Sequence, residues 1–120
     1  MRRKLRLEML DDYVAVFRII YLCRSSIFVQ TENQTECEVI KVIEQDAISL
    51  QKKYDKTFER IGMLGPSFLL FRRELSNETD EKKFSESKKQ ISKEKLDNLQ
   101  NKLKLLESKH NAITLKLHYK

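Results

Sequence analysis

A coiled-coil seam is present in residues 96–117, which read LDNLQNKLKLLESKHNAITLKL. Apolar side chains recur there in steps of three and four residues, and a histidine fills the single gap. The seven seam positions are Leu96, Leu99, Leu103, Leu106, His110, Ile113 and Leu117. This spacing is typical of the a/d stripe of a coiled coil rather than of the broader face of a globular helix. Because a helix cannot bury a narrow stripe by itself, the sequence predicts a partner helix, in this chain or in another.

A second segment with the same spacing precedes this seam. It follows Thr35, which matches a capping box together with Glu38. The positions expected in this second seam include Ile40, Ile43, Leu50 and Tyr54. The pattern predicts a helix over residues 36–61 that ends at Gly62, a natural left-handed stop. We expect the two seams to pair and to form the interface with partner chains.

The N-terminal segment carries a wider apolar surface than either seam. Over residues 5–28, apolar side chains fall on two neighbouring helical faces, which is typical of a helix that is covered on more than one side. Its β-branched and aromatic residues would also suit a strand. No turn signal interrupts the run before Ser25, so we predict a helix over residues 5–28.

The principal turn is expected at residues 62–66, which contain both glycines and the only proline. The apolar run that follows, residues 67–75, is compatible with a short helix or with a β-hairpin. After a polar break, a last helix is expected over residues 80–118, with a stutter or kink near Ser92 where the spacing changes phase. The predicted fold is all-α: one domain over residues 1–120, an elongated antiparallel bundle or coiled coil of three long helices.

Composition agrees with this fold and narrows the function. Two glycines and one proline among 120 residues fit long helices with few turns. No nucleophile–base pair, paired carboxylates or metal-ligand spacing stands out, so we expect no enzyme activity, no metal and no cofactor. The apolar run Tyr13 to Cys23 is too short for a transmembrane segment.

The two cysteines bear on the compartment. A Cys23–Cys37 disulfide remains open, but two thiols in an otherwise disulfide-poor chain favour an intracellular protein, cytoplasmic or nuclear.

The net charge of +6 reflects basic residues near both ends of the chain. The densest cluster is Arg2, Arg3, Lys4 and Arg6, and a looser run includes Lys82, Lys89 and Lys93. On one continuous helix the three lysines would share a side. Such a face could bind nucleic acid or an anionic surface. Lysines on the solvated side of a coiled coil give the same pattern, and we favour that interpretation.

His110 occupies a seam position. A polar residue there can fix the register of helix pairing or respond to pH. The sequence favours a simpler interpretation, a half-exposed histidine near a helix end.

The residues around the principal turn resemble those of β-class prefoldin subunits. The stretch Phe58-Glu59-Arg60-Ile61-Gly62, with Leu64-Gly65-Pro66-Ser67-Phe68-Leu69-Leu70 and Arg73-Glu74-Leu75, is similar to the β-hairpin entry of that family. Thr31-Glu32-Asn33 is similar to a segment that precedes this step. The resemblance implies a β-hairpin between two long helices, and an ATP-independent chaperone that captures unfolded protein at its helix tips. The sequence departs from the family at residues 76–83, which are too polar to supply an evident second strand.

We expect the two seams and the broad apolar surface of residues 5–28 to be more apolar surface than a chain of 120 residues can bury by itself. The sequence therefore predicts a non-enzymatic coiled-coil subunit that assembles with other helical proteins as a homo- or hetero-oligomer. A prefoldin-like chaperone subunit and a basic helical protein that binds nucleic acid or a membrane surface are the alternatives.

Overall fold

The structure, a computed structural model, describes the backbone of residues 2–28, 34–85 and 89–118, and the side chains of residues 7–26, 38–77 and 91–117. Most of this backbone belongs to four helices, named α1 (Arg2–Ser25), α2 (Gln34–Arg60), α3 (Pro66–Ser85) and α4 (Lys93–His118). Two three-residue strands, β1 (Ser26–Phe28) and β2 (Lys89–Ile91), complete it. The predicted all-α class is confirmed, and a fourth long helix, α3, stands where the sequence allowed a short helix or a β-hairpin.

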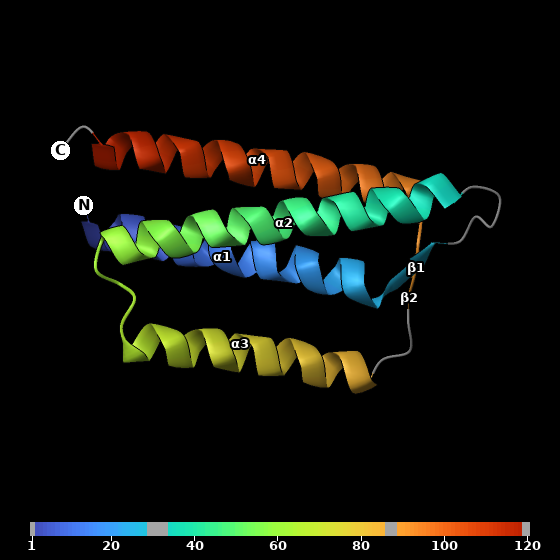
Figure 1. Cartoon of the computed structure of the whole chain (residues 1–120), viewed down its shortest axis with the longest axis horizontal. Coiled ribbons are helices and arrows are strands. Elements are labelled where there is room, and N and C mark those ends of the chain that lie inside the picture. Colours follow the sequence, from blue (N-terminus) through green and yellow to red (C-terminus); the bar gives the residue numbers. More distant parts are fainter. Residues whose placement is uncertain (1, 29–33, 86–88, 119–120) are drawn as a thin grey trace.

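The helices form an elongated bundle that measures 51 × 29 × 18 Å along its principal axes. Helices α1 and α3 run in one direction and α2 and α4 in the other, so both ends of the chain lie at the same end of the bundle (Figure 1). At the opposite end β1 pairs with β2 in parallel, with Ser26 opposite Lys89 and Phe28 opposite Ile91. Because β1 follows α1 and β2 follows α3, this pairing joins the ends of those two helices.

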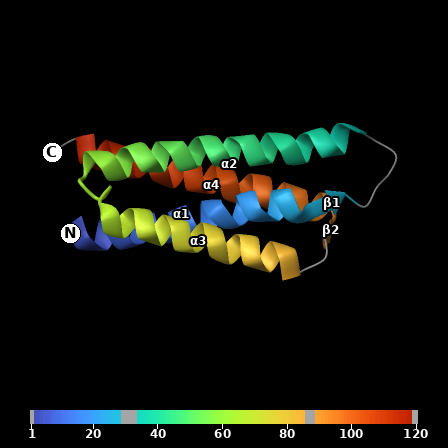
Figure 2. The same ribbon diagram turned by 60° about the horizontal axis from the view of Figure 1, so that its bottom comes forward.

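Helix α1 is central in the bundle. It contacts α2, α3 and α4. In Figure 1 it lies between α3 and the other two helices, and Figure 2 shows α3 crossing in front of it. Met9, Tyr13, Val16 and Ile19 of α1 are at most 1% exposed. The width of its apolar surface is therefore matched by helices packed on more than one side of it.

The turn between α2 and α3 is formed as the sequence predicts. Gly62 has a φ of 76°, in the left-handed region that favours glycine. The amide of Gly62 donates to the carbonyl of Glu59 at 3.1 Å, and the amide of Met63 donates to that of Phe58 at 2.8 Å. These two bonds make a Schellman motif, which satisfies the last carbonyls of α2. Helix α3 then begins at Pro66, where the missing amide proton costs nothing.

The boundaries of α3 and α4 differ from the prediction. Residues 67–75 form neither a separate short helix nor a β-hairpin, because they belong to the 20-residue α3. Residues 80–85 also belong to α3, so the helix expected over 80–118 begins only at Lys93. Its start is explained by Ser92, whose hydroxyl accepts a hydrogen bond from the amide of Lys95 at 3.3 Å, as an N-cap does. The polar residues 76–80 do not interrupt α3, since they include neither glycine nor proline.

The first two helices lie close to their expected positions. The helix expected over 36–61 spans Gln34–Arg60, and the side chain of its expected cap, Thr35, lies outside the described residues. The helix expected over 5–28 spans Arg2–Ser25, because the next three residues pair with β2 instead. The hydroxyl of Ser25 donates to the carbonyl of Tyr21 at 2.9 Å, a local bond of the kind that competes with helix continuation.

Candidate functional site

The two predicted seams are buried within the chain itself. Nearly all their residues are among the buried core, namely Leu96, Leu99, Leu103, Leu106, His110 and Ile113 of α4 and Ile40, Ile43, Leu50 and Tyr54 of α2; Leu117 is partly buried. The two helices pair, as expected, but they run in the same direction, whereas the sequence predicted an antiparallel bundle. The premise that these seams exceed what the chain can bury is wrong, because the broad surface of α1 covers both helices. The seams therefore do not need a second chain.

His110 lies in a buried polar contact between α4 and α2. Its Nε2 is 2.9 Å from Oγ1 of Thr57, and this hydroxyl donates its only proton to the carbonyl of Lys53 at 3.0 Å. Nε2 must therefore be the donor, which leaves Nδ1 as an unprotonated acceptor in the neutral ring. Nδ1 has no hydrogen-bond partner within the described part of the chain.

This environment keeps the His110 ring neutral. Burial lowers the pKa of His110 below its ordinary value, and the ring of Tyr54 packs against it at a centroid distance of 4.6 Å. The prediction that His110 is half exposed is thus wrong, since its exposed fraction is only 5%. The contact is a polar element of the core.

A chain of polar contacts connects three helices at the aromatic end of the core. The hydroxyl of Tyr13 on α1 donates to Oδ1 of Asp55 on α2 at 3.1 Å, and the guanidinium of Arg72 on α3 lies 3.3 Å from Oδ2 of the same carboxylate. Burial raises the pKa of Tyr13 to about 12, so its hydroxyl stays a donor at neutral pH. With Phe58 and Phe68 packed against Tyr13, these contacts fix the position of α3 on the bundle.

Cys23 is the cysteine whose side chain the structure describes. Cys23 is free and buried, and burial raises its pKa to about 11, so the thiol stays protonated at neutral pH. The side chain of Cys37 lies outside the described residues. Among the side chains that the structure describes, no three His, Cys, Asp or Glu residues are grouped so as to hold a metal ion.

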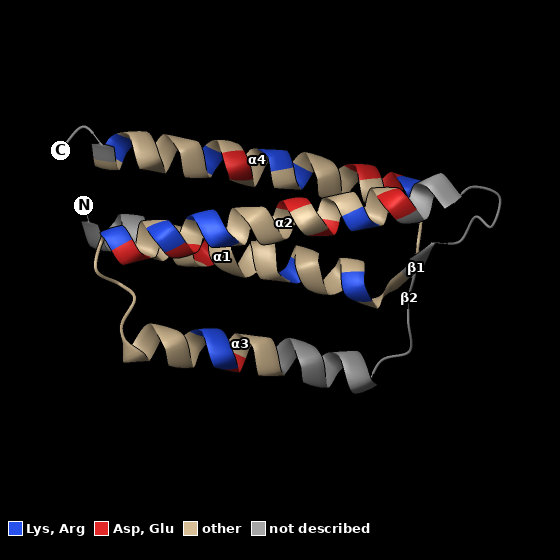
Figure 3. Ribbon diagram, in the orientation of Figure 1, with Lys and Arg blue, Asp and Glu red and all other residues tan. Residues whose placement is uncertain are grey.

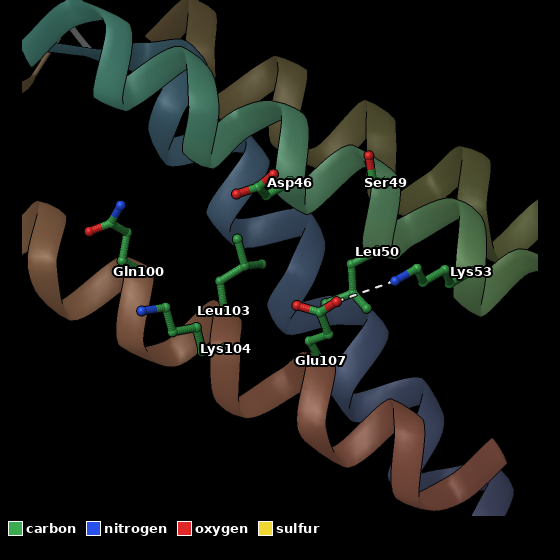
Figure 4. Close-up of a pocket in the computed structure, with 8 residues that line it drawn as sticks. All are labelled: Asp46, Ser49, Leu50, Lys53, Gln100, Leu103, Lys104 and Glu107. Atoms are coloured by element: carbon green, nitrogen blue, oxygen red, sulfur yellow. Dashed lines mark hydrogen bonds and ion pairs between the residues drawn. The ribbon is translucent and has the colours of Figure 1, made fainter. Parts of the chain in front are cut away.

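A shallow groove of about 320 Å³ runs between α2 and α4 (Figure 4). The side chains of α2 and α4 that line it are Asp46, Ser49, Leu50, Lys53, Gln100, Leu103, Lys104 and Glu107. Lys53 and Glu107 reach across it and pair at 3.2 Å. Because both signs of charge are equally represented, the groove favours no particular class of ligand.

The predicted basic patch is divided between elements. Arg2, Arg3, Lys4 and Arg6 lie in the first turns of α1, whereas Lys82 lies in α3, Lys89 in β2 and Lys93 at the start of α4. The lysines therefore do not share one helical side, because the expected continuous helix is interrupted by β2. The strand end of the bundle is opposite the end where α1 begins (Figure 1), so the two clusters are also separated. Among these residues only Lys93 has a described side chain, and it is exposed.

One exposed face of α4, which the apolar spacing did not predict, carries no charge. This outer stripe consists of six exposed residues in steps of three and four: Asn98, Asn101, Leu105, Ser108, Ala112 and Leu115. Leu105 and Leu115 are 59% and 58% exposed. From Asp97 to Lys116, every other exposed residue of α4 except Asn111 is charged.

The position of the outer stripe follows from the seam. Each of its residues comes two positions after a seam residue, and two residues correspond to about 200° around a helix. The stripe therefore lies opposite the core, facing solvent. The sequence signal that would have found it is the lack of charge at each of these positions, in a chain with charges along much of its surface (Figure 3).

Comparison with protein-family models, with curated proteins and with solved structures gives no match to this chain. The β-hairpin that the prefoldin resemblance implies after Gly62 is not formed, because residues 66–85 are helical. In the part of the chain that the structure describes, no helix has the length and apolarity needed to cross a membrane.

Proposed function

We propose that this protein is a non-enzymatic helical subunit that assembles with another protein chain through the outer stripe of α4. The observation that carries the proposal is the stripe itself. It combines coiled-coil spacing, solvent exposure and lack of charge on a helix whose remaining exposed residues from Asp97 to Lys116 are charged except for Asn111. Single exposed leucines are ordinary on protein surfaces, but two leucines aligned in an uncharged stripe with coiled-coil spacing favour an interaction face.

The side chains of the stripe suit helix packing. Leu105 and Leu115 are large enough to insert between side chains of a second helix, and Ser108 and Ala112 leave room for large side chains of that helix. From Asn98 to Leu115 the stripe is about 26 Å long at the usual helical rise, enough for several turns of contact. The opposite face of α4 is anchored in the core by Leu103 and Leu106, which supports the stripe with a rigid backbone.

The experiment compares two double variants of the full chain. Leu105→Glu with Leu115→Glu places charge on the stripe, and Leu69→Glu with Leu70→Glu places it on equally exposed leucines of α3 as the matched control. Each is expressed in the native source, and the mass of the complex that contains it is measured by size-exclusion chromatography with light scattering. We expect wild type and control to elute well above the 14.3 kDa of the monomer, and the stripe variant to elute as the monomer.

Two results would contradict the proposal. One is a wild-type protein that is monomeric in its native source. The other is a stripe variant that keeps the complex intact. Circular dichroism of the purified variants checks that neither pair of glutamates disturbs the helices, which the exposure of all four leucines leads us to expect.

A further inference from the structure

We infer that the chain docked on the outer stripe is an amphipathic helix with acidic residues beside its own apolar seam, rather than a second copy of this protein. The inference rests on the proposed function and adds the chemistry of the partner. It comes from the charges along the two edges of the stripe, which in coiled coils decide which helices pair.

One edge of the stripe consists of lysines. Lys102, Lys109 and Lys116 each follow a stripe residue directly, at the positions that flank a partner helix. The other edge consists of Asp97, Lys104 and Asn111, each directly before a stripe residue. All six residues are exposed. A docked helix would therefore lie between two edges that together carry four positive charges and one negative charge.

Most of these lysines are available to a partner. Lys102, Lys104 and Lys116 have no ion-pair partner among the residues that the structure describes. Lys109 lies 3.7 Å from the carboxylate of Asp12 on α1, and its side chain is still 55% exposed. Docking an acidic helix would thus add ion pairs without breaking one that holds the bundle together.

A second copy of this chain fits the stripe less well. If two outer stripes paired in antiparallel fashion, the lysine edge of each would face the lysine edge of the other. If they paired in parallel, Asp97 would face Lys102 of the second copy, but Lys104 would face its Lys109, so attraction and repulsion would cancel. A helix with Glu or Asp at its flanking positions gains along the lysine edge in either direction.

A membrane surface also fits the stripe less well. Helices that lie in anionic membranes have a wide apolar face with several large side chains. The outer stripe has only Leu105 and Leu115 as large apolar residues, and Asn98, Asn101 and Ser108 lie in line with them. Its narrow, partly polar form favours the surface of another helix.

The test uses two fluorescent three-heptad peptides with the same leucine seam. One has Glu and the other Lys at all flanking positions, so that neither associates with itself. Binding to the full chain is measured by fluorescence anisotropy at low and high salt. We expect the acidic peptide to bind at least about tenfold more tightly than the basic one, with a difference that shrinks as salt rises.

Three variants locate the binding and its cause. Leu105→Glu with Leu115→Glu abolishes binding of the acidic peptide, whereas Leu69→Glu with Leu70→Glu leaves it unchanged. The charge-reversal variant with Lys102→Glu, Lys104→Glu and Lys116→Glu keeps the stripe and inverts the preference between the peptides. These lysines are exposed and make no described ion pair, so the folded state is retained.

Four results would overturn the inference. Two come from the peptides: equal or tighter binding of the basic peptide, or binding of neither peptide. The third is a wild-type dimer in sedimentation experiments that Leu105→Glu with Leu115→Glu converts to monomer. The fourth is stripe-dependent binding of the chain to phosphatidylserine vesicles. Failure of the proposed function is separate, because it is shown by a monomeric wild-type protein in the native source or by a native complex that survives the stripe variant. If the native complex depends on the stripe and any of the four results is obtained, only the acidic partner is wrong.

Discussion

The seam and the outer stripe of α4 lie on opposite faces of one helix and follow the same spacing. The seam is made of large apolar side chains except at His110, and from Leu96 to Ile113 each of its residues is at most 7% exposed. The outer stripe has two leucines among Asn, Ser and Ala residues, and all of it is exposed. The comparison shows that spacing alone does not decide which stripe the chain buries. The apolar area of the side chains decides it, because covering small or polar residues gains little free energy.

The largest effect on the free energy of unfolding is expected when a seam side chain is shortened. Leu103→Ala removes a nearly fully buried leucine and leaves a cavity between the packed helices, so it should lower the free energy of unfolding by about 3 kcal/mol. Urea denaturation followed by circular dichroism measures the change. A loss below about 1 kcal/mol would mean that the seam is not part of the cooperative core.

The next effect concerns the single polar position of the seam. Thr57→Val keeps the shape of the side chain but removes the hydroxyl oxygen that lies 2.9 Å from Nε2 of His110, which should lower the free energy of unfolding by about 1–2 kcal/mol. His110→Leu instead removes the unpaired Nδ1 and extends the leucine pattern, so it should cost less than Thr57→Val. In the His110→Leu background Thr57→Val should have little effect, and a double-mutant cycle in urea checks this. A larger loss of unfolding free energy from His110→Leu than from Thr57→Val would contradict the assignment of Nε2 as the hydrogen-bond donor.

A pH dependence of smaller size should follow from the same residue. Burial lowers the pKa of His110 in the folded state below the ordinary value of 6.5, so the unfolded chain binds the proton more tightly. The stability that depends on a neutral His110 is therefore fully present above about pH 6.5 and is lost as the pH falls below it. The difference in unfolding free energy between wild type and His110→Leu, measured from pH 7.5 to 5, isolates this contribution from that of the carboxyl groups. A difference that is constant with pH would show that His110 is not desolvated.

The smallest effect is expected on the outer stripe. Leu105→Ala removes the same side chain as Leu103→Ala, two residues away on the other face, and should change the free energy of unfolding of the isolated chain by less than about 0.5 kcal/mol. The same urea denaturation experiment measures both variants, so they compare a buried leucine of the seam directly with an exposed leucine of the outer stripe. A loss of similar size from both variants would mean that the stripe is covered in the isolated chain.

Much of the fold could be predicted because local signals agree with it. The apolar spacing of α2, the width of the apolar surface of α1 and the left-handed stop at Gly62 all correspond to what the structure contains. The break before α4 was predicted only as a change of phase near Ser92. Its true form, an N-cap after a strand, depends on the pairing of β2 with a distant segment, and periodicity carries no information about such pairing.

The candidate site was harder to predict, for physical reasons. Nothing in the spacing of the seams says which surface covers them, so their burial against α1 could not be distinguished from burial against a second chain. The burial of His110 depends on Thr57, 53 residues away in the sequence. The outer stripe was not predicted because the spacing of large apolar residues gives no signal at positions such as Ser108 and Ala112. At these positions the signal is the absence of a charge.

The central position of α1 has a consequence for synthesis of the protein. This helix is synthesised before the three helices that cover it. Its apolar surface therefore stays exposed to solvent until α2, α3 and finally α4 have been made. A nascent chain released before Leu96 lacks the seam of α4 and exposes aromatic and aliphatic side chains that aggregate readily. Translation arrest ahead of the last helix is thus expected to yield insoluble fragments that depend on holding factors until they are degraded.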